Sequence, residues 1–185
     1  MDENGSTGVA VTDASSNDSE ERVSFATLRF GEITVARSRI LEFPRGMVGM
    51  PQGRRFVFLH LEDEPGPFFW LQSVDDPALA FVVCEPQRFF PHYHIPLSRE
   101  DQSTLHLSDQ QDGLVCVILV VPEDPRHITA NLRGPLIINT VARLGMQLVL
   151  AGDDYPVRAP LFHSETPSAG QTFASGTEGA KQCSF

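Results

Sequence analysis

The chain is poor in the residue patterns on which catalysis depends. It contains no Gly-x-Ser-x-Gly elbow, no Walker A loop and no dinucleotide-binding fingerprint, and none of its three cysteines stands in a nucleophile motif. These absences exclude the common hydrolase, nucleotide-binding and dehydrogenase signatures. We therefore expect a protein that is not an enzyme and that binds no cofactor.

Long apolar runs and a cysteine framework are also missing. No apolar run approaches the roughly 20 residues that span a bilayer, and the N-terminus lacks the basic and apolar regions of a signal peptide. Cys84 and Cys116 lie inside apolar runs, and Cys183 lies near the C-terminus. An odd number of cysteines without framework spacing favours a reducing compartment. The prediction is a cytoplasmic protein with no membrane contact.

Positive charge is scarce. The chain has 14 basic and 24 acidic residues, and its formal net charge is -10. An acidic chain repels phosphate backbones, so direct binding of nucleic acid is disfavoured, whereas a basic protein partner would suit it.

Both ends of the chain have the composition of disordered segments. Residues 1–22 are acidic and rich in Ser, Asn and Thr, and residues 163–185 are rich in Ser, Thr, Gly and Ala. Such segments bury too little apolar surface to offset their ordering entropy. We predict two disordered tails around one domain at 23–162. An alternative is that Phe173 and Phe185 dock onto the domain or onto a partner.

The segment between the tails has the pattern of β structure. Short aromatic and β-branched runs separated by Pro and Gly favour an antiparallel sandwich or small barrel. The strands are expected at 27–30, 33–35, 40–43, 55–60, 68–72, 79–84 and 114–121, and as a hairpin of 135–141 and 146–150 around 142–145. The run at 114–121 is continuous enough for a strand buried on both faces.

Helical signals are few. Ser98 followed by Asp101 resembles a capping box and predicts a short helix over 99–105, and one further turn is expected at 86–90. The consecutive aromatics Phe68, Phe69 and Trp70 cannot share one face of a strand. Either both faces are covered, or one of them offers an aromatic anchor to a partner.

Two short motifs could carry chemistry, but each has a simpler structural interpretation. Gly46-Met47-Val48-Gly49 resembles the loop with which KH domains clamp nucleic acid, and it equally suits a turn with positive φ. His92 and His94 would share one face of a strand and could hold zinc with a third ligand. The candidates for that ligand are His60, His106 and His127.

Four acidic clusters lie in predicted turns and would be solvated there or would border a protein interface. They are Glu62-Asp63-Glu64, Asp75-Asp76, Glu123-Asp124 and Asp153-Asp154.

Taken together, spaced residues from about Phe30 to Leu161 resemble the FliW family of flagellar assembly factors. The matching residues are Phe43-Pro44-x-Gly46-x-x-Gly49, Phe69-x-Leu71-Gln72-Ser73 with Pro77 and Ala80-Phe81, Pro86, Phe89-Phe90, Tyr93, Thr129-x-Asn131-Leu132-x-Gly134-Pro135-Leu136-Ile137-Ile138-Asn139, Gly145-x-Gln147-Leu148-x-Leu150 and Tyr155. The resemblance implies a small, mostly β, antiparallel barrel-like single domain with one or two short helices and no enzymatic activity.

The resemblance also implies two partners. FliW-like proteins bind newly made flagellin, and they bind the translational repressor CsrA and lift its block on flagellin mRNA. The implied switch is an exchange of partners, because flagellin occupies FliW until secretion drains it. A flagellin chaperone without a CsrA role is an alternative, and a histidine-based metal-binding protein is another.

The resemblance assigns no residue to either partner, so the expected contacts come from side-chain chemistry. Phe90 and Tyr93 with His94 are expected to form an exposed aromatic patch, and Glu123 and Asp124 an acidic turn that suits a basic RNA-binding protein. A second set is expected to be structural. Asn131 can close an Asx turn before Pro135, a buried Asn139 must find hydrogen-bond partners, and Gln72 is a structural residue of its motif.

Overall fold

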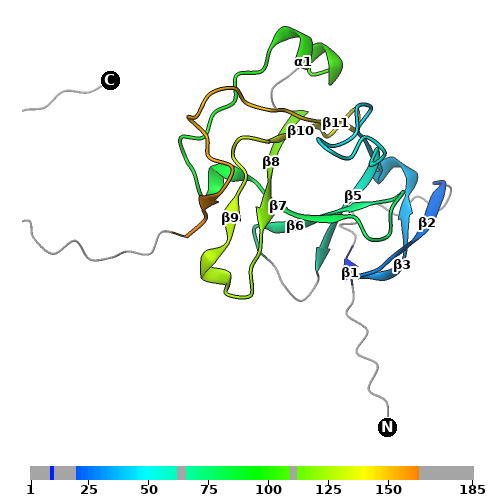
Figure 1. Ribbon diagram of the computed structural model, residues 1–185. Coiled ribbons are helices and arrows are strands. Elements are labelled where there is room, and N and C mark those ends of the chain that lie inside the picture. The colour runs from blue at the N-terminus through cyan, green and yellow to red at the C-terminus, as the bar shows by residue number, and fades with distance from the viewer. Residues whose placement is uncertain (1–8, 11–19, 62–65, 109–111, 163–185) are drawn as a thin grey trace, which may run out of the picture.

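The computed structural model describes residues 9–10, 20–61, 66–108 and 112–162, which form mostly β structure (Figure 1). The strands are β1 (Val9–Ala10), β2 (Arg22–Thr27), β3 (Gly31–Ala36), β4 (Leu41–Glu42), β5 (Arg55–Leu61), β6 (Phe68–Ser73), β7 (Ala80–Cys84), β8 (Gly113–Val120), β9 (Thr129–Ala130), β10 (Leu136–Asn139), β11 (Leu144–Gln147) and β12 (Ala159–Pro160). The helical elements are α1 (Arg99–Thr104) and the 3-10 turns η1 (Arg37–Arg39), η2 (Pro86–Arg88) and η4 (Pro125–His127).

Seven of the strands close into a ring. Strands β4, β5, β6, β7 and β8 are successive antiparallel neighbours, β8 also pairs with β10, and β10 pairs with β11. Strand β11 returns to β4 where Leu144 pairs with Glu42, and this one contact is parallel. The predicted barrel-like, mostly β fold is therefore confirmed, with one parallel closure in an otherwise antiparallel ring.

The inside of the ring is filled by alternate residues of its strands. Phe56 of β5, Leu71 of β6, Val83 of β7 and Cys116 of β8 are all buried in one cluster. This period of two is what a strand requires when one of its faces points to a core. The other alternate residues therefore point outward and need covers of their own.

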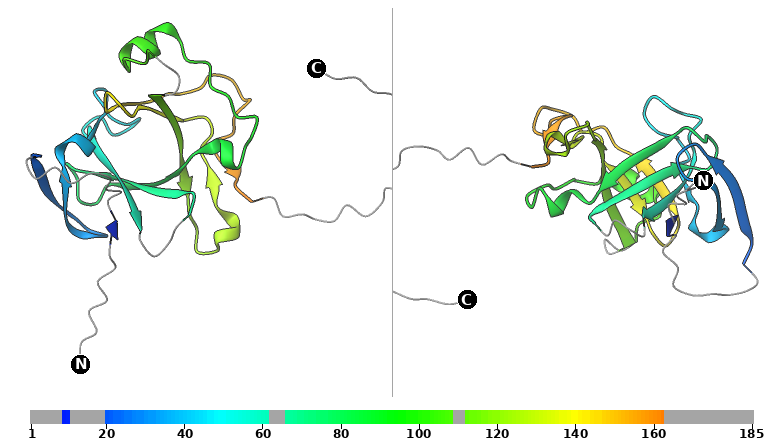
Figure 2. Two further views of the ribbon diagram at one scale, coloured as in Figure 1. Left: turned by 180° about the vertical axis from the view of Figure 1, so that it is seen from behind. Right: turned by 90° about the horizontal axis from the view of Figure 1, so that it is seen from below.

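Three covers bury the outer face of the ring, as the two views of Figure 2 show from behind and from below. The hairpin β2–β3 lies over β5 and β6, where Phe30 meets Trp70 edge to face at 5.5 Å. Helix α1 brings Leu105 over Ile137 of β10. The segments around β9 and β12 cover the outside of β7 and β8, and Phe89, which follows η2, stacks on Phe68 of β6. The aromatic run 68–70 thus has both of its faces covered.

Local signals predicted several elements well. The five strands β5 to β8 and β10 lie where the apolar runs placed them. Helix α1 has the predicted capping box, because Ser98 Oγ accepts the Asp101 N–H at 3.1 Å and the Asp101 carboxylate accepts the Ser98 N–H at 3.1 Å. The strand expected over 114–121 has Cys116 inside the ring and Val117 under the outer cover.

Other predictions were wrong in position. The strand expected at 27–30 is the turn between β2 and β3, where the Thr27 hydroxyl accepts the Phe30 N–H and Gly31 takes a φ of 70°. The turn of the β10–β11 hairpin begins at Thr140 rather than at residue 142. Within the predicted N-terminal tail, Val9–Ala10 form β1 and pair with β5, and β2 already begins at Arg22. Residues 1–8, 11–19 and 163–185 of the predicted tails lie outside the described residues.

Candidate functional site

Three segments that carry family-like motifs meet at the end of the β10–β11 hairpin opposite its turn. They contain Val48, Asn131 to Gly134, and Gln147. The backbone N–H of Val48 donates to Oε1 of Gln147 at 2.9 Å, and Nε2 of Gln147 donates to the Gly134 carbonyl at 3.2 Å. Oδ1 of Asn131 accepts the N–H groups of Gly134 and Arg133 at 3.1 and 3.2 Å. The two side-chain amides are thereby turned toward backbone groups, which holds the three segments together.

Above this polar network lies an apolar hollow of about 190 Å³, roughly the size of one large side chain. Its walls are three exposed valines, Val48, Val149 and Val157, with exposed fractions of 56, 68 and 51%. We call this feature the valine groove. A Cβ at Gly134 would lie 2.9 Å from Nδ2 of Asn131 and 3.1 Å from Nε2 of Gln147, so a larger residue there would displace the amides beneath the groove. Isolated exposed valines have no sequence signature, so the sequence did not predict this groove.

The expected aromatic patch is only partly present. Tyr93 is 5% exposed, packs edge to face on Tyr155 at 4.8 Å, and donates its hydroxyl to the Leu132 carbonyl at 2.6 Å. The prediction of an exposed Tyr93 was wrong, because this ring fills the outer cluster beneath β9 and its burial raises the pKa of the phenol. Phe90 is half-buried and His94 is exposed, so these two still lie at the surface.

The acidic turn is also only partly available. Asp124 caps η4, and its carboxylate accepts from Nε and Nη2 of Arg126 at 3.0 and 2.8 Å. The Arg126 hydrogen bonds lower the pKa of Asp124. Glu123 is exposed and has no polar partner among the described residues. Of the two predicted carboxylates, Glu123 is therefore the one that a partner could reach.

The acidity of the chain lies largely outside the described domain. The described residues contain fourteen Asp and Glu beside thirteen Arg, so they are nearly neutral. Ten of the 24 acidic residues, including the cluster at 62–64, lie outside the described residues. The described residues by themselves would therefore repel a phosphate backbone less than the net charge of the whole chain suggests.

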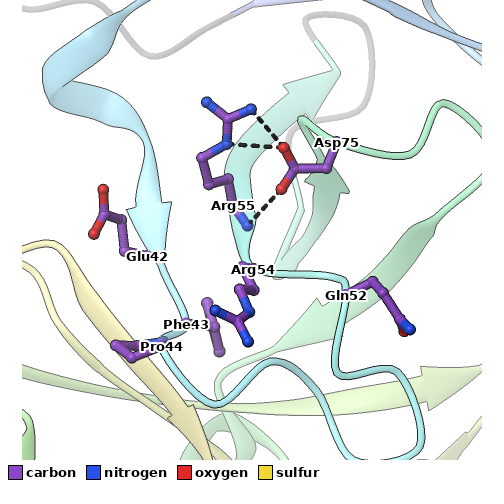
Figure 3. Close-up of a pocket in the computed structure, with 7 residues that line it drawn as sticks. All are labelled: Glu42, Phe43, Pro44, Gln52, Arg54, Arg55 and Asp75. Carbon is purple, nitrogen blue, oxygen red and sulfur yellow. Dashed lines mark hydrogen bonds and ion pairs between the residues drawn. The ribbon is translucent and has the colours of Figure 1, made fainter.

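A hollow near the barrel closure is shown in Figure 3. Its volume is about 470 Å³, and it is lined by Glu42, Phe43, Pro44, Gln52, Arg54, Arg55 and Asp75. Arg55 donates from Nε to Oδ1 of Asp75 at 2.8 Å and from its backbone N–H to Oδ2 at 3.1 Å, and this pairing raises the pKa of Arg55. Figure 3 shows Glu42 on the side of Arg55 away from Asp75, and Glu42 pairs with Arg55 across β4 and β5. None of these seven residues is a nucleophile paired with a base, so the hollow suits binding of a polar group.

The residues expected to be structural have internal partners. Asn131 forms the predicted Asx turn, and Pro135 is buried with its carbonyl accepting the Leu148 N–H at 2.9 Å. Asn139 is 2% exposed and makes four hydrogen bonds, as predicted for a buried amide. Gln72 is fully buried, and its Nε2 donates to the carbonyls of Ser73 and Leu79 at 3.0 and 3.1 Å, whereas its Oε1 is buried without a hydrogen-bond partner among the described residues.

The two chemical motifs have structural roles here. Gly46 and Gly49 take φ values of 67° and 80° in a turn between β4 and β5, which confirms the turn and removes the helical setting of a KH loop. His92 and His94 are both exposed, and the described residues contain no cluster of three His, Cys, Asp or Glu that could hold a metal. Among the described residues, none of the helices has the length and hydrophobicity to cross a bilayer.

Burial makes two cysteines unreactive. Cys84 and Cys116 are buried free thiols, and burial raises the pKa of each to about 12. At pH 8 only about one such thiol in ten thousand is a thiolate, which is the reactive form. We expect the Cys183→Ser variant to show no reaction with DTNB at pH 8 while folded, and to react at both thiols in denaturant. Rapid reaction of the folded variant would contradict this burial.

Comparisons with known proteins agree on one family. The model of the FliW protein family matches residues 24–161. The chain is 39% identical over 133 residues to flagellar assembly factor FliW 2 of Desulfotalea psychrophila, covering 72% of this chain and 87% of that protein. It is 41% identical over 137 residues to flagellar assembly factor FliW of Moorella thermoacetica, covering 74% and 86%. A crystal structure of the flagellar assembly factor FliW superposes with a TM-score of 0.73 at 37% identity, covering 78% of this chain and 100% of that one.

Proposed function

This chain belongs to the FliW family of flagellar assembly factors, and on that basis we propose that it acts by binding flagellin and the translational regulator CsrA in the cytoplasm, without catalysis. The two partners exclude each other. Flagellin that has not been secreted occupies the protein and leaves CsrA free to repress flagellin mRNA. When flagellin is exported, the protein captures CsrA and translation resumes. Competition of this kind follows from linkage, because a ligand that excludes another lowers its apparent affinity.

The valine groove is the observation that supports a binding role most directly. It is an apolar hollow at the meeting point of three family motifs, and the amides beneath it are engaged with backbone groups. Interfaces are commonly anchored by an apolar side chain that enters such a hollow. In this proposal the groove receives an apolar side chain of flagellin, and the exposed Glu123 meets basic groups of CsrA.

Calorimetry with CsrA and flagellin from the same genome tests the partner exchange. The expected result is one complex with each protein, and loss of CsrA binding when flagellin is present. Binding to flagellin without binding to CsrA would favour the alternative of a flagellin chaperone with no translational role. Simultaneous binding of both would contradict the exchange.

Replacing Val149 by aspartate tests the groove. Val149→Asp places a solvated carboxylate in the apolar hollow, and we expect the affinity for flagellin to fall by about tenfold or more. The matched control is Val141→Asp, because Val141 is 73% exposed in the hairpin turn and does not line the groove. Equal affinities of the two variants for flagellin would show that the groove is not the contact.

A further inference from the structure

Strand β2 is an open edge. Hairpin β2–β3 forms a separate two-stranded sheet, and among the described residues no strand pairs with β2 other than β3. All views place β2 at the periphery of the molecule, and the view from below in Figure 2 shows it most clearly. Proteins usually protect such an edge with proline, lysine or a bulge. The register of β2 is unbroken over six residues, and its only charged residue is Arg22.

The register fixes which backbone groups face outward. Arg22 pairs with Ala36, and the Arg37 N–H donates to the Glu21 carbonyl at 2.8 Å, so Arg22 and Ala36 form a pair that is not hydrogen-bonded across the hairpin. Such pairs alternate with hydrogen-bonded ones. The N–H and C=O groups of Arg22, Ser24 and Ala26 therefore point away from β3, toward the open edge.

The edge is complementary to itself. If two copies of β2 run antiparallel with Ser24 opposite Ser24, all three outward residues of each copy face an outward residue of the other. Arg22 then lies opposite Ala26, so no like charges meet. Val23 lies opposite Phe25 on the face that packs toward the cluster of Ile33 and Val35. Cross-strand pairs of a β-branched and an aromatic residue are stabilising.

From this complementarity we propose that the protein forms a symmetric dimer through β2, which joins the two hairpins into one four-stranded sheet. The pairing adds about six backbone hydrogen bonds between the copies. It also stabilises the hairpin, because an isolated two-stranded sheet is only marginally stable in water. The interface uses the same patch on both copies, as a two-fold axis requires.

Opposite charges at Ser24 test both the surface and the register. Ser24 is exposed, so Ser24→Lys and Ser24→Glu leave the monomer folded, but each places two like charges opposite each other at the two-fold axis. Sedimentation of the full chain over a wide concentration range is expected to give a dimer for the wild type and a dissociation constant raised about tenfold or more for each variant. An equimolar mixture of the two variants is expected to recover the dimer.

The matched control is Thr34→Lys. Thr34 lies beside Ser24 on the same face, with the two hydroxyl oxygens 2.8 Å apart, but it lies on β3, one strand away from the edge. This variant is expected to dimerise like the wild type. Hydrogen exchange gives a second measurement, since the Ser24 amide becomes protected only in the dimer, whereas the Phe25 amide is already bonded to β3.

Three results would overturn the proposal. A wild-type monomer at every concentration would show that the edge stays open or accepts a different chain. A dimer insensitive to both Ser24 substitutions would place the interface elsewhere. A mixture that fails to recover the dimer would exclude the register. None of these results bears on whether the protein binds flagellin or CsrA, so failure of the dimer and failure of the proposed function are separable.

Discussion

Replacing Asn139 by alanine is expected to lower the free energy of unfolding by about 3 kcal/mol. The Asn139 amide Nδ2 donates to the carbonyls of Leu105 and His106 at 2.9 and 3.1 Å, and Oδ1 accepts the N–H groups of Val141 and Ala142 at 2.9 and 2.8 Å. This one side chain thus joins the end of α1 to the turn of the β10–β11 hairpin. Alanine leaves four backbone groups without partners, and at least the Leu105 carbonyl lies in a buried region.

The measurement is urea unfolding followed by fluorescence of Trp70, the only tryptophan of the chain. Trp70 lies under Phe30 with Arg29 4.4 Å from its ring centre, so its environment changes when the outer cover opens. The matched control is Asn131→Ala, which removes the same amide from a half-buried site where it accepts two hydrogen bonds from backbone N–H groups. That control is expected to lower the free energy of unfolding by about 1 kcal/mol. Equal losses of unfolding free energy in the two variants would contradict the claim that the four hydrogen bonds of Asn139 stabilise the fold.

An element of the fold can be predicted from the sequence when the residues that determine it lie close together in the chain. Strands β5 to β8 follow from runs of aromatic and β-branched residues, and α1 follows from the spacing of Ser98 and Asp101, because these signals act within a few residues. The closure of the ring depends on β8 meeting β10 and on Leu144 meeting Glu42 from about a hundred residues away in the chain. No local pattern encodes such a pairing, so the residue patterns left both a sandwich and a small barrel open, and the family resemblance favoured the barrel.

The candidate site was harder to predict than the fold. Gln147, Asn131 and Val48 each lie in a motif that the sequence displays, but their common location depends on the return of the hairpin to the loop after β4. Tyr93 was misassigned for a related reason. An irregular segment has no fixed side-chain period, so its sequence does not tell which side chain turns inward. The exposed fractions of Phe90 and Glu123 likewise come from tertiary packing.

The β10–β11 hairpin shows how a local sequence pattern can predict a turn correctly but place it at the wrong residues. The spacing of the two apolar runs predicted a turn at 142–145. In the structure Arg143, with a φ of 58°, takes the left-handed position, and Gly145 lies within β11. Glycine inside a strand often marks a close approach by another group. Here that group is the ring of Phe43, which is fully buried in the core of the barrel.

Replacing Gly145 by alanine is therefore expected to lower the free energy of unfolding by about 3 kcal/mol, although alanine is the smallest possible change. A Cβ at this position would lie less than 3.0 Å from three carbons of the Phe43 ring. The ring cannot move away easily, because it packs edge to face on Phe56 at 5.2 Å inside the closed ring of strands. The glycine thus provides the space in which Phe43 seals the barrel beside the parallel closure of β4 and β11.

A double-mutant cycle distinguishes this clash from a general sensitivity of the strand. Phe43→Leu removes the far end of the ring and leaves a cavity. This variant by itself is expected to lower the free energy of unfolding by about 1 kcal/mol or more. If the clash is the cause, Gly145→Ala costs much less in the Phe43→Leu background, so the two losses are not additive. Additive losses in urea unfolding would mean that the Phe43 ring is not what requires glycine. The same cycle tests the closure of the barrel, since Phe43 and Gly145 belong to the two segments that meet there.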